Sequence, residues 1–131
     1  QVIDDLLNID FEPNKVVISA NPELLRPIEI EMNDLFGNET NIVISGPVYL
    51  DFTAKDIDKG ASLKRFCEMK GIDRADVIAF GDNYNDVTMI EYAGLGVAMG
   101  NAIPNLKSIA NVVTATNDED GIALILKKVL E

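Results

Sequence analysis

Histidine and tryptophan are absent from this 131-residue chain, and cysteine occurs only once. Without histidine, neither a Cys-His pair nor a histidine-bearing catalytic triad can form. A single cysteine cannot form an internal disulfide, and without histidine beside it a zinc site lacks its usual ligands. Cys67 lies at helical spacing from Leu63 and Phe66, which indicates a buried apolar residue rather than a nucleophile.

Basic residues are also scarce, since 11 lysines and arginines stand against 22 aspartates and glutamates, a net charge of −11. Such a charge repels nucleic acids and anionic membranes, so we expect neither as a partner. No apolar run approaches the ~20 residues that span a bilayer, and no signal peptide opens the chain, so we expect a cytoplasmic protein. A hydrophobic content of 47% is sufficient for a packed core.

The first half of the chain predicts an α+β unit. Residues 1–14 form an acidic connector in this prediction, and Asn21-Pro22 begins a helix that Gly37 ends. Pro27 lies inside that helix, so the helix either kinks or begins again there. The strands expected in this half are 15–19, 41–45 and 48–53.

From about residue 59 onward, predicted strands alternate with predicted helices. This pattern indicates βα units and a parallel sheet with both faces covered, hence an α/β fold. Thr116 and Glu119 form a capping box that opens the last helix. That helix places on one face Ile122, Ile125, Leu126, Val129 and Leu130. The other expected elements are helices at 60–70, from 85 or 86, and at 104–110, and strands at 77–80, 96–99 and 111–114.

The loop Gly81–Asp86, with the sequence GDNYND, follows the apolar strand expected at 77–80. In an open α/β sheet, ligands bind beyond the carboxyl ends of the strands, so Asp82 can point a carboxylate into that crevice. Carboxylate oxygens suit Mg²⁺, whereas a turn rich in Asn and Asp can equally be a simple helix cap. An EF-hand is excluded, because Val87 and Ala93 stand where that loop requires Gly and Glu.

Lys59 precedes Gly60 at the start of a predicted helix, where the helix dipole disfavours a positive charge. The residue could neutralise a phosphate beside Asp82, although a solvated surface lysine is the commoner outcome. Gly94, Gly96 and Gly100 partly match the glycine pattern of dinucleotide-binding sites. They follow a predicted helix and lack the strand–turn–helix context of such sites, so we do not expect a dinucleotide to bind there.

Three motifs in fixed order resemble the haloacid dehalogenase superfamily of phosphatases, in its Cof-type sugar-phosphatase group. They are Lys59-Gly60, the residues Gly81-Asp82, Asn85 and Asp86, and the run Gly96–Ala102. The resemblance implies that residues 55–131 form the C-terminal half of a Rossmann-like parallel core, and residues 1–54 the end of an α+β cap domain. It covers residues 57–131 closely and residues 15–53 more weakly.

The resemblance also implies a reaction and roles for four residues. The family hydrolyses phosphomonoesters through an aspartyl-phosphate intermediate, with Mg²⁺ as cofactor and a small phosphorylated substrate. Asp82 is then a Mg²⁺ ligand, and Asn85 holds phosphate or metal-bound water. Lys59 contacts the phosphate and the nucleophile, and Asp86 orients Lys59.

The nucleophile of this family lies in a motif Asp-x-Asp-Gly-Thr/Ser after the first core strand, and the chain lacks this motif. Asp51-Phe52-Thr53 and the pairs Asp56/Asp58 and Asp118/Asp120 do not match its context. We therefore expect a C-terminal piece of a longer phosphatase, inactive alone, that dimerises through an exposed sheet edge. The alternative is a non-catalytic interaction module that has lost the nucleophile. A third interpretation is a phosphoacceptor domain of receiver type, but such a domain needs a further acidic pair after its first strand, and this sequence has none there.

Overall fold

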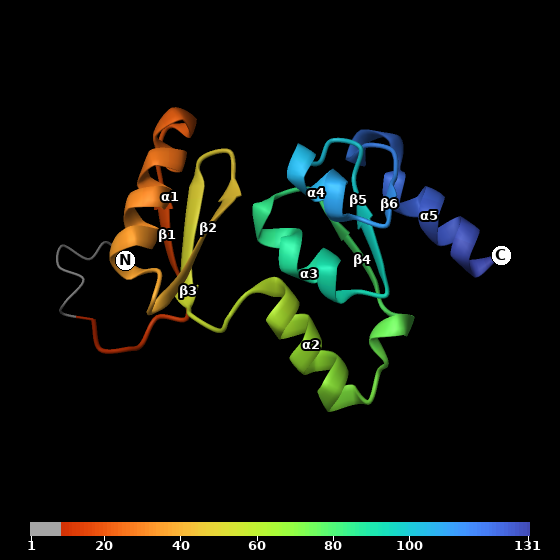
Figure 1. The fold of residues 1–131 in the computed structure, drawn as a ribbon, viewed down its shortest axis with the longest axis horizontal. Coiled ribbons are helices and arrows are strands. Elements are labelled where there is room, and N and C mark those ends of the chain that lie inside the picture. Colours follow the sequence, from red (N-terminus) through yellow and green to blue (C-terminus); the bar gives the residue numbers. More distant parts are fainter. Residues whose placement is uncertain (1–8) are drawn as a thin grey trace.

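A computed structural model describes residues 9–131, so residues 1–8 of the expected acidic connector lie outside the described part. The chain forms two separate three-stranded sheets, one antiparallel in the order β1-β3-β2 and one parallel in the order β4-β5-β6. The two sheets lie side by side, and a short segment leads from β3 into α2 (Figure 1). The α/β fold expected from the sequence is thereby confirmed.

The antiparallel sheet carries one helix on one of its faces. The helix α1 (Pro22–Phe36) covers the face that buries Leu25, Ile42 and Leu50. Side chains alternate along a strand, so the residues between these point to the other face. The strands are β1 (Val16–Ser19), β2 (Thr40–Gly46) and β3 (Tyr49–Ala54).

Helix α1 is continuous through Pro27, so a restart of the helix at this residue is wrong, and a kink there stays a prediction. Pro27 deprives the Glu23 carbonyl of its helical donor, but both residues are exposed and water can serve that carbonyl. Asn21 precedes the helix as expected, although its side chain forms no capping hydrogen bond.

The parallel sheet is covered by short helices that follow its strands. Helix α3 packs on β4 and β5, and α2 packs on α3. The core contains Ile90 of α3 and Leu106 of α4, at 2% and 0% exposure. The elements are α2 (Lys59–Lys70), β4 (Ile78–Gly81), α3 (Val87–Tyr92), β5 (Leu95–Ala98), α4 (Pro104–Ile109), β6 (Val112–Val113) and α5 (Gly121–Leu130), with single turns η2 (Arg74–Asp76), η3 (Tyr84–Asp86) and η4 (Asn117–Glu119).

Two predicted apolar faces are less buried than their sequences indicate. On α2, Cys67 is buried as expected, whereas Phe66 is 53% exposed. The capping box of Thr116 and Glu119 closes the single turn η4, and α5 begins after Asp120, which has a positive φ of 56°. Of the apolar face predicted for the last helix, only Ile125 is buried.

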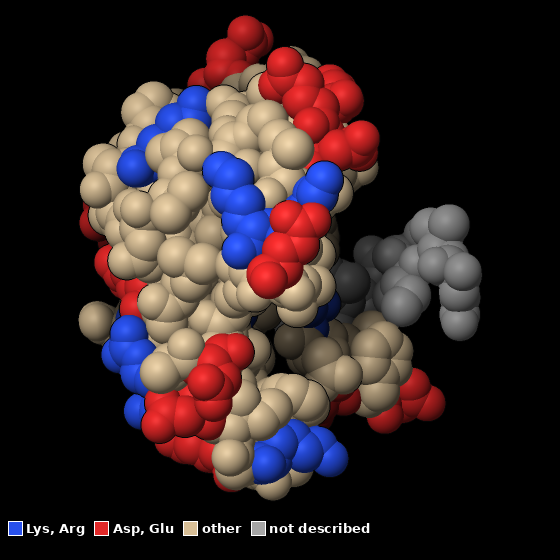
Figure 2. All heavy atoms as spheres, turned by 90° about the vertical axis from the view of Figure 1, so that its right-hand side faces the viewer, with Lys and Arg blue, Asp and Glu red and all other residues tan. Residues whose placement is uncertain are grey.

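The side of the molecule on which α5 lies carries large uncharged areas between separate groups of charged residues (Figure 2). Both residues of β6 are exposed, Val112 at 38% and Val113 at 49%. The described residues therefore do not cover the parallel sheet fully, contrary to expectation.

None of the described helices is long and apolar enough to cross a membrane. The division into residues 1–54 and 55–131 stays a prediction.

Gly60 allows α2 and α3 to approach closely, since a Cβ at this position would overlap the backbone of Thr88. We expect Gly60→Ala to lower the free energy of unfolding by about 1–3 kcal/mol, because the new methyl group would meet the backbone of Thr88, which cannot move aside as a flexible side chain could. Arg65→Ala, at an exposed position of the same helix, is the matched control. Urea denaturation measures both, and equal stability of the two variants would contradict the close approach.

Candidate functional site

The carboxyl ends of the parallel strands bring three loops to one edge of the sheet. Gly81, the last residue of β4, stands opposite Ala98, the last residue of β5. Asp82 therefore begins its loop beside Asn101, which follows β5. Because parallel strands end at a common edge, residues far apart in the sequence meet here.

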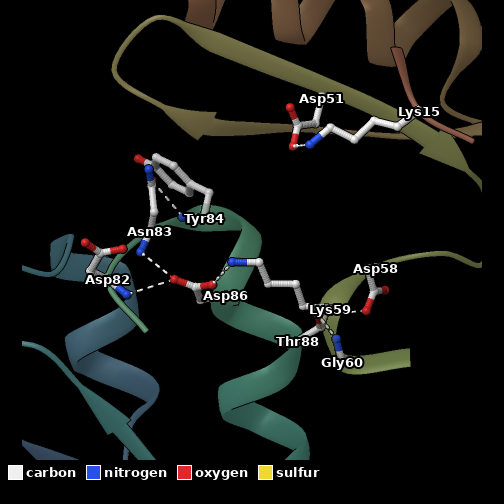
Figure 3. A network of polar contacts seen from close by, with 10 residues as sticks. All are labelled: Lys15, Asp51, Asp58, Lys59, Gly60, Asp82, Asn83, Tyr84, Asp86 and Thr88. Carbon is white, nitrogen blue, oxygen red and sulfur yellow. Dashed lines mark hydrogen bonds and ion pairs between the residues drawn. The ribbon is translucent and has the colours of Figure 1, made fainter. Parts of the chain in front are cut away.

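Asp86 organises the loop Gly81–Asp86. Its side chain is 5% exposed, and its Oδ2 accepts hydrogen bonds from the backbone N–H groups of Asp82, at 2.9 Å, and Asn83, at 3.2 Å. Its Oδ1 pairs with the Lys59 ammonium (Figure 3). One buried carboxylate thus fixes the loop backbone and the position of a lysine 27 residues earlier in the chain. Gly81 leaves room for this carboxylate, because a Cβ there would lie 2.5 Å from Cβ of Asp86.

Lys59 is held at the first position of α2 by contacts between α2 and α3. Oδ1 of Asp58 accepts from the Ala61 N–H, which caps α2, and from the hydroxyl of Thr88, each at 2.8 Å. The Thr88 hydroxyl in turn accepts from the Gly60 N–H at 3.0 Å. These bonds explain why a lysine stands where the helix dipole disfavours it: Asp58 and Asp86 both supply negative charge beside it.

Asp82 lies exposed at the sheet edge, and a chain of amides restrains it. One oxygen, Oδ2, accepts from Nδ2 of Asn101 at 3.2 Å. Oδ1 of Asn101 accepts from the backbone N–H of Asn117 at 3.1 Å, and Asn117 opens the turn η4. The loops that follow β4, β5 and β6 are therefore connected through Asn101.

A cleft of about 460 Å³ separates this edge from the antiparallel sheet, a volume within the usual range for small-molecule sites. Lys59 and Asn85 line it from the parallel unit, while Asp82 and Asp86 are not among its lining residues. Tyr84 borders the cleft beneath the guanidinium of Arg26, 5.9 Å from the ring centroid, so one contact joins α1 to the loop after β4.

The opposite wall of the cleft is the sheet face turned away from α1. It includes Lys15 and Asp51, whose Nζ and Oδ2 atoms lie 2.6 Å apart (Figure 3). Asn41 and Thr53 also line it, and both bind the backbone carbonyl of Ile57, at 3.1 and 2.6 Å. These two bonds fix the segment between β3 and α2, and hence the start of the helix that carries Lys59.

The described residues offer one carboxylate for a metal ion at the sheet edge, not a full ligand set. Within residues 9–131, no group of three acidic, cysteine or histidine side chains is arranged to hold a metal. The carboxylate of Asp82 has hard oxygen atoms suited to Mg²⁺. The carboxylate of Asp86, in contrast, already bonds the Lys59 ammonium and the loop backbone. A magnesium ion bound here would need further ligands from outside this set of residues or from a substrate phosphate.

A family model for haloacid dehalogenase-like hydrolases matches residues 1–126. The chain belongs to this family. A putative phosphatase of Haemophilus influenzae is 43% identical over 116 residues, which cover 88% of this chain and 44% of that protein. The chain thus spans less than half the length of the curated relatives that it matches.

Solved structures of other proteins show the same arrangement of elements. SMU.1108c of Streptococcus mutans superposes with a TM-score of 0.89 at 26% identity, over 98% of this chain and 48% of that one. The sugar phosphatase BT4131, of subclass IIB, has a TM-score of 0.72 at 30% identity, over 88% of this chain and 42% of that one. The Cof-type resemblance read from the sequence motifs is confirmed.

The structure of this haloacid dehalogenase-like hydrolase brings the four predicted site residues to one region. Lys59 and Asp86 form an ion pair, Asn85 borders the same cleft as Lys59, and Asp82 begins the same loop. Their chemical roles stay predictions. Sequence reasoning missed Asn101, although it lies in the quoted run Gly96–Ala102.

The sequence interpretation also gave no role to Lys15 or Asp51 on the cap side. A signal was present in the strand itself, since Asp51 stands between Leu50 and Phe52, at the position that alternation assigns to the other face. As a candidate nucleophile Asp51 does not match the family motif, and its place in the cleft depends on the tertiary structure.

The two members of the ion pair should contribute unequally to stability. We expect Asp86→Ala to cost about 2–4 kcal/mol, because two backbone N–H groups lose their acceptor. Lys59 is about half exposed, so Lys59→Ala should cost less than about 1 kcal/mol. Chemical denaturation compares them, with Asp86→Asn as the variant that keeps an acceptor oxygen. Equal losses for Asp86→Ala and Lys59→Ala would contradict the central place of Asp86.

Hydrogen bonds from the Thr116 hydroxyl and N–H lower the pKa of Glu119 below its usual value. A lowered pKa in the folded state adds stability above the unfolded pKa, and this is lost as the pH falls through the folded pKa. We expect Thr116→Val to raise the pKa of Glu119 toward its usual value, as measured by NMR titration of the carboxyl carbon. An unchanged titration would mean that the hydroxyl bond does not hold this carboxylate.

Proposed function

We propose that this chain supplies the phosphate-binding half of a Mg²⁺-dependent phosphomonoester hydrolase. The observation that carries the proposal is the Lys59–Asp86 pair, held beside Asn85 at the mouth of a cleft and next to the loop of Asp82. A fixed cation, an amide and a carboxylate suited to magnesium are the groups that phosphoryl transfer requires, because most of its catalysis is positioning and electrostatic stabilisation.

Each residue has a distinct task in this proposal. Lys59 binds a phosphate oxygen and offsets the charge that the transferred group carries. Asp86 holds the ammonium in place at the cleft. Asn85 donates its amide to phosphate or to a metal-bound water, and Asp82 supplies one ligand to Mg²⁺. The ion, when bound, would neutralise charge on the phosphoryl group.

The nucleophile in this proposal comes from outside the chain. The aspartyl-phosphate chemistry expected of the family needs a second carboxylate that is free to attack near Asp82, and the one that the described residues place there, Asp86, is bonded to Lys59 and to the loop backbone. The chain also spans under half of its relatives' length. We therefore infer that a longer phosphatase contains these residues, with residues 1–54 as the end of its cap and 55–131 as the second part of its core.

The proposed substrates are small phosphate esters of the sugar-phosphate kind. The structurally similar BT4131 is a sugar phosphatase, and the cleft beside Lys59 has the size for such a molecule. The homodimer expected through the sheet edge and the cytoplasmic location stay predictions.

Hydrolysis of an aryl phosphate with Mg²⁺ tests the proposal. We expect no turnover by the 131-residue chain above that of Asp82→Asn, because the nucleophile is missing. The longest polypeptide that contains these residues should hydrolyse the ester. Its Asp82→Asn and Lys59→Met variants should lose at least about 10²-fold in kcat, since each removes a charge that stabilises the transition state.

Two results would contradict this assignment in different ways. Turnover by the 131-residue chain that disappears in Asp82→Asn would locate a nucleophile within the chain. A longer polypeptide without any phosphatase activity would favour the non-catalytic interaction module.

A further inference from the structure

The loop that contains Asn101 is held in place by its own backbone. The N–H of Ile103 donates to the Asp82 carbonyl at 3.0 Å, which joins this loop to the one that follows β4. On the other side, the N–H of Gly100 donates to the Ala115 carbonyl at 2.9 Å, which joins it to the loop that follows β6. The three loops are therefore connected without help from the Asn101 side chain.

These backbone bonds leave the carboxylate of Asp82 free to turn. Asp82 is exposed, and within residues 9–131 the only hydrogen bond to its carboxylate comes from Nδ2 of Asn101, at 3.2 Å. An exposed side chain without a partner samples several rotamers, whereas a group that binds a metal ion has to be held in one. What the Asn101 side chain adds to the loop is therefore the orientation of this carboxylate.

The direction of the Asn101 amide is set by the loop that follows β6. Its Oδ1 accepts from the backbone N–H of Asn117 at 3.1 Å, and a backbone N–H can only donate. The carbonyl end of the amide must therefore face Asn117, which turns the NH₂ end toward Asp82. Aspartate at position 101 would keep the acceptor and lose the donor, whereas alanine would lose both.

Given the function proposed above, on which this inference rests, we propose that Asn101 is a positioning residue for Asp82. Its amide holds Oδ2 of the carboxylate and leaves Oδ1 available for Mg²⁺, and the N–H of Asn117 determines which way the amide points. A ligand that is oriented before the ion arrives loses less freedom on binding, so the ion binds more tightly.

NMR of the 131-residue chain without metal tests the orientation directly. Vicinal couplings from the backbone nitrogen and the carbonyl carbon to Cγ report the χ1 rotamer of Asp82. We expect one rotamer in the wild type and the loss of this rotamer in Asn101→Ala and Asn101→Asp. The matched control is Asn105→Asp, which adds the same charge at an exposed position on α4 and should keep the single rotamer. A rotamer that neither substitution of Asn101 affects would overturn the inference.

The aspartate variant separates positioning from a purely structural link between loops. If Asn101 served only to hold the N–H of Asn117, Asn101→Asp would keep that bond and behave as the wild type, and only Asn101→Ala would be impaired. If Asn101 positions Asp82, Asn101→Asp should be at least as damaging as Asn101→Ala, because a second carboxylate repels the first.

In the longest polypeptide that contains these residues, the same variants should change the magnesium requirement. We expect the Mg²⁺ concentration that half-saturates hydrolysis of an aryl phosphate to rise by about 10–100-fold in Asn101→Ala, the usual effect of removing a partner of a metal ligand. KM for the ester at saturating Mg²⁺ should stay close to that of the wild type, because Asn101 is not among the residues that line the cleft. Asn105→Asp should leave both quantities unchanged.

The two measurements distinguish this inference from the proposed function. If Asp82→Asn abolishes hydrolysis but both variants of Asn101 keep the wild-type magnesium requirement, the inference is wrong and the proposed function stands. If the longer polypeptide has no phosphatase activity while the rotamer of Asp82 still depends on Asn101, the proposed function is wrong and the positioning of Asp82 stands. If neither the activity nor the rotamer dependence is found, both are overturned.

Discussion

The buried carboxylate of Asp86 is the contact on which the rest of the site depends. It accepts two backbone N–H groups of its own loop and pairs with Lys59 on another helix. A carboxylate with three donors is fixed in position, and the lysine is fixed with it. Together with the bonds among Asp58, Gly60 and Thr88, this side chain fixes the start of α2 against the loop that follows β4.

The surrounding structure serves the same arrangement. Gly81 leaves space for Asp86, and Gly60 allows α2 to approach α3 until Asp58 and Thr88 bond. On the cap side, the Ile57 carbonyl ties the linker to the antiparallel sheet through Asn41 and Thr53. A lysine at a helix start, unfavourable in isolation, is thereby held between two acids on a scaffold with little freedom.

The cleft combines walls of different chemistry. The side of the parallel sheet carries a cation, Lys59, and an amide, Asn85, whereas the antiparallel sheet carries the ion pair of Lys15 and Asp51.

The sequence alone determined the alternation of strands and helices, the family, and the choice of Lys59, Asp82, Asn85 and Asp86 as candidate site residues. This was possible because motifs such as Gly81–Asp86 place their polar side chains at neighbouring positions of the sequence. The tertiary structure decided which residues meet across long sequence separations. Asn101 reaches Asp82 because β4 and β5 end together, and Asp51 and Lys59 line one cleft because the antiparallel sheet lies beside the parallel one. Periodicity identified the apolar faces of α2 and α5, whereas the exposure of Phe66 and of most of the α5 face depends on neighbouring elements that periodicity does not reveal.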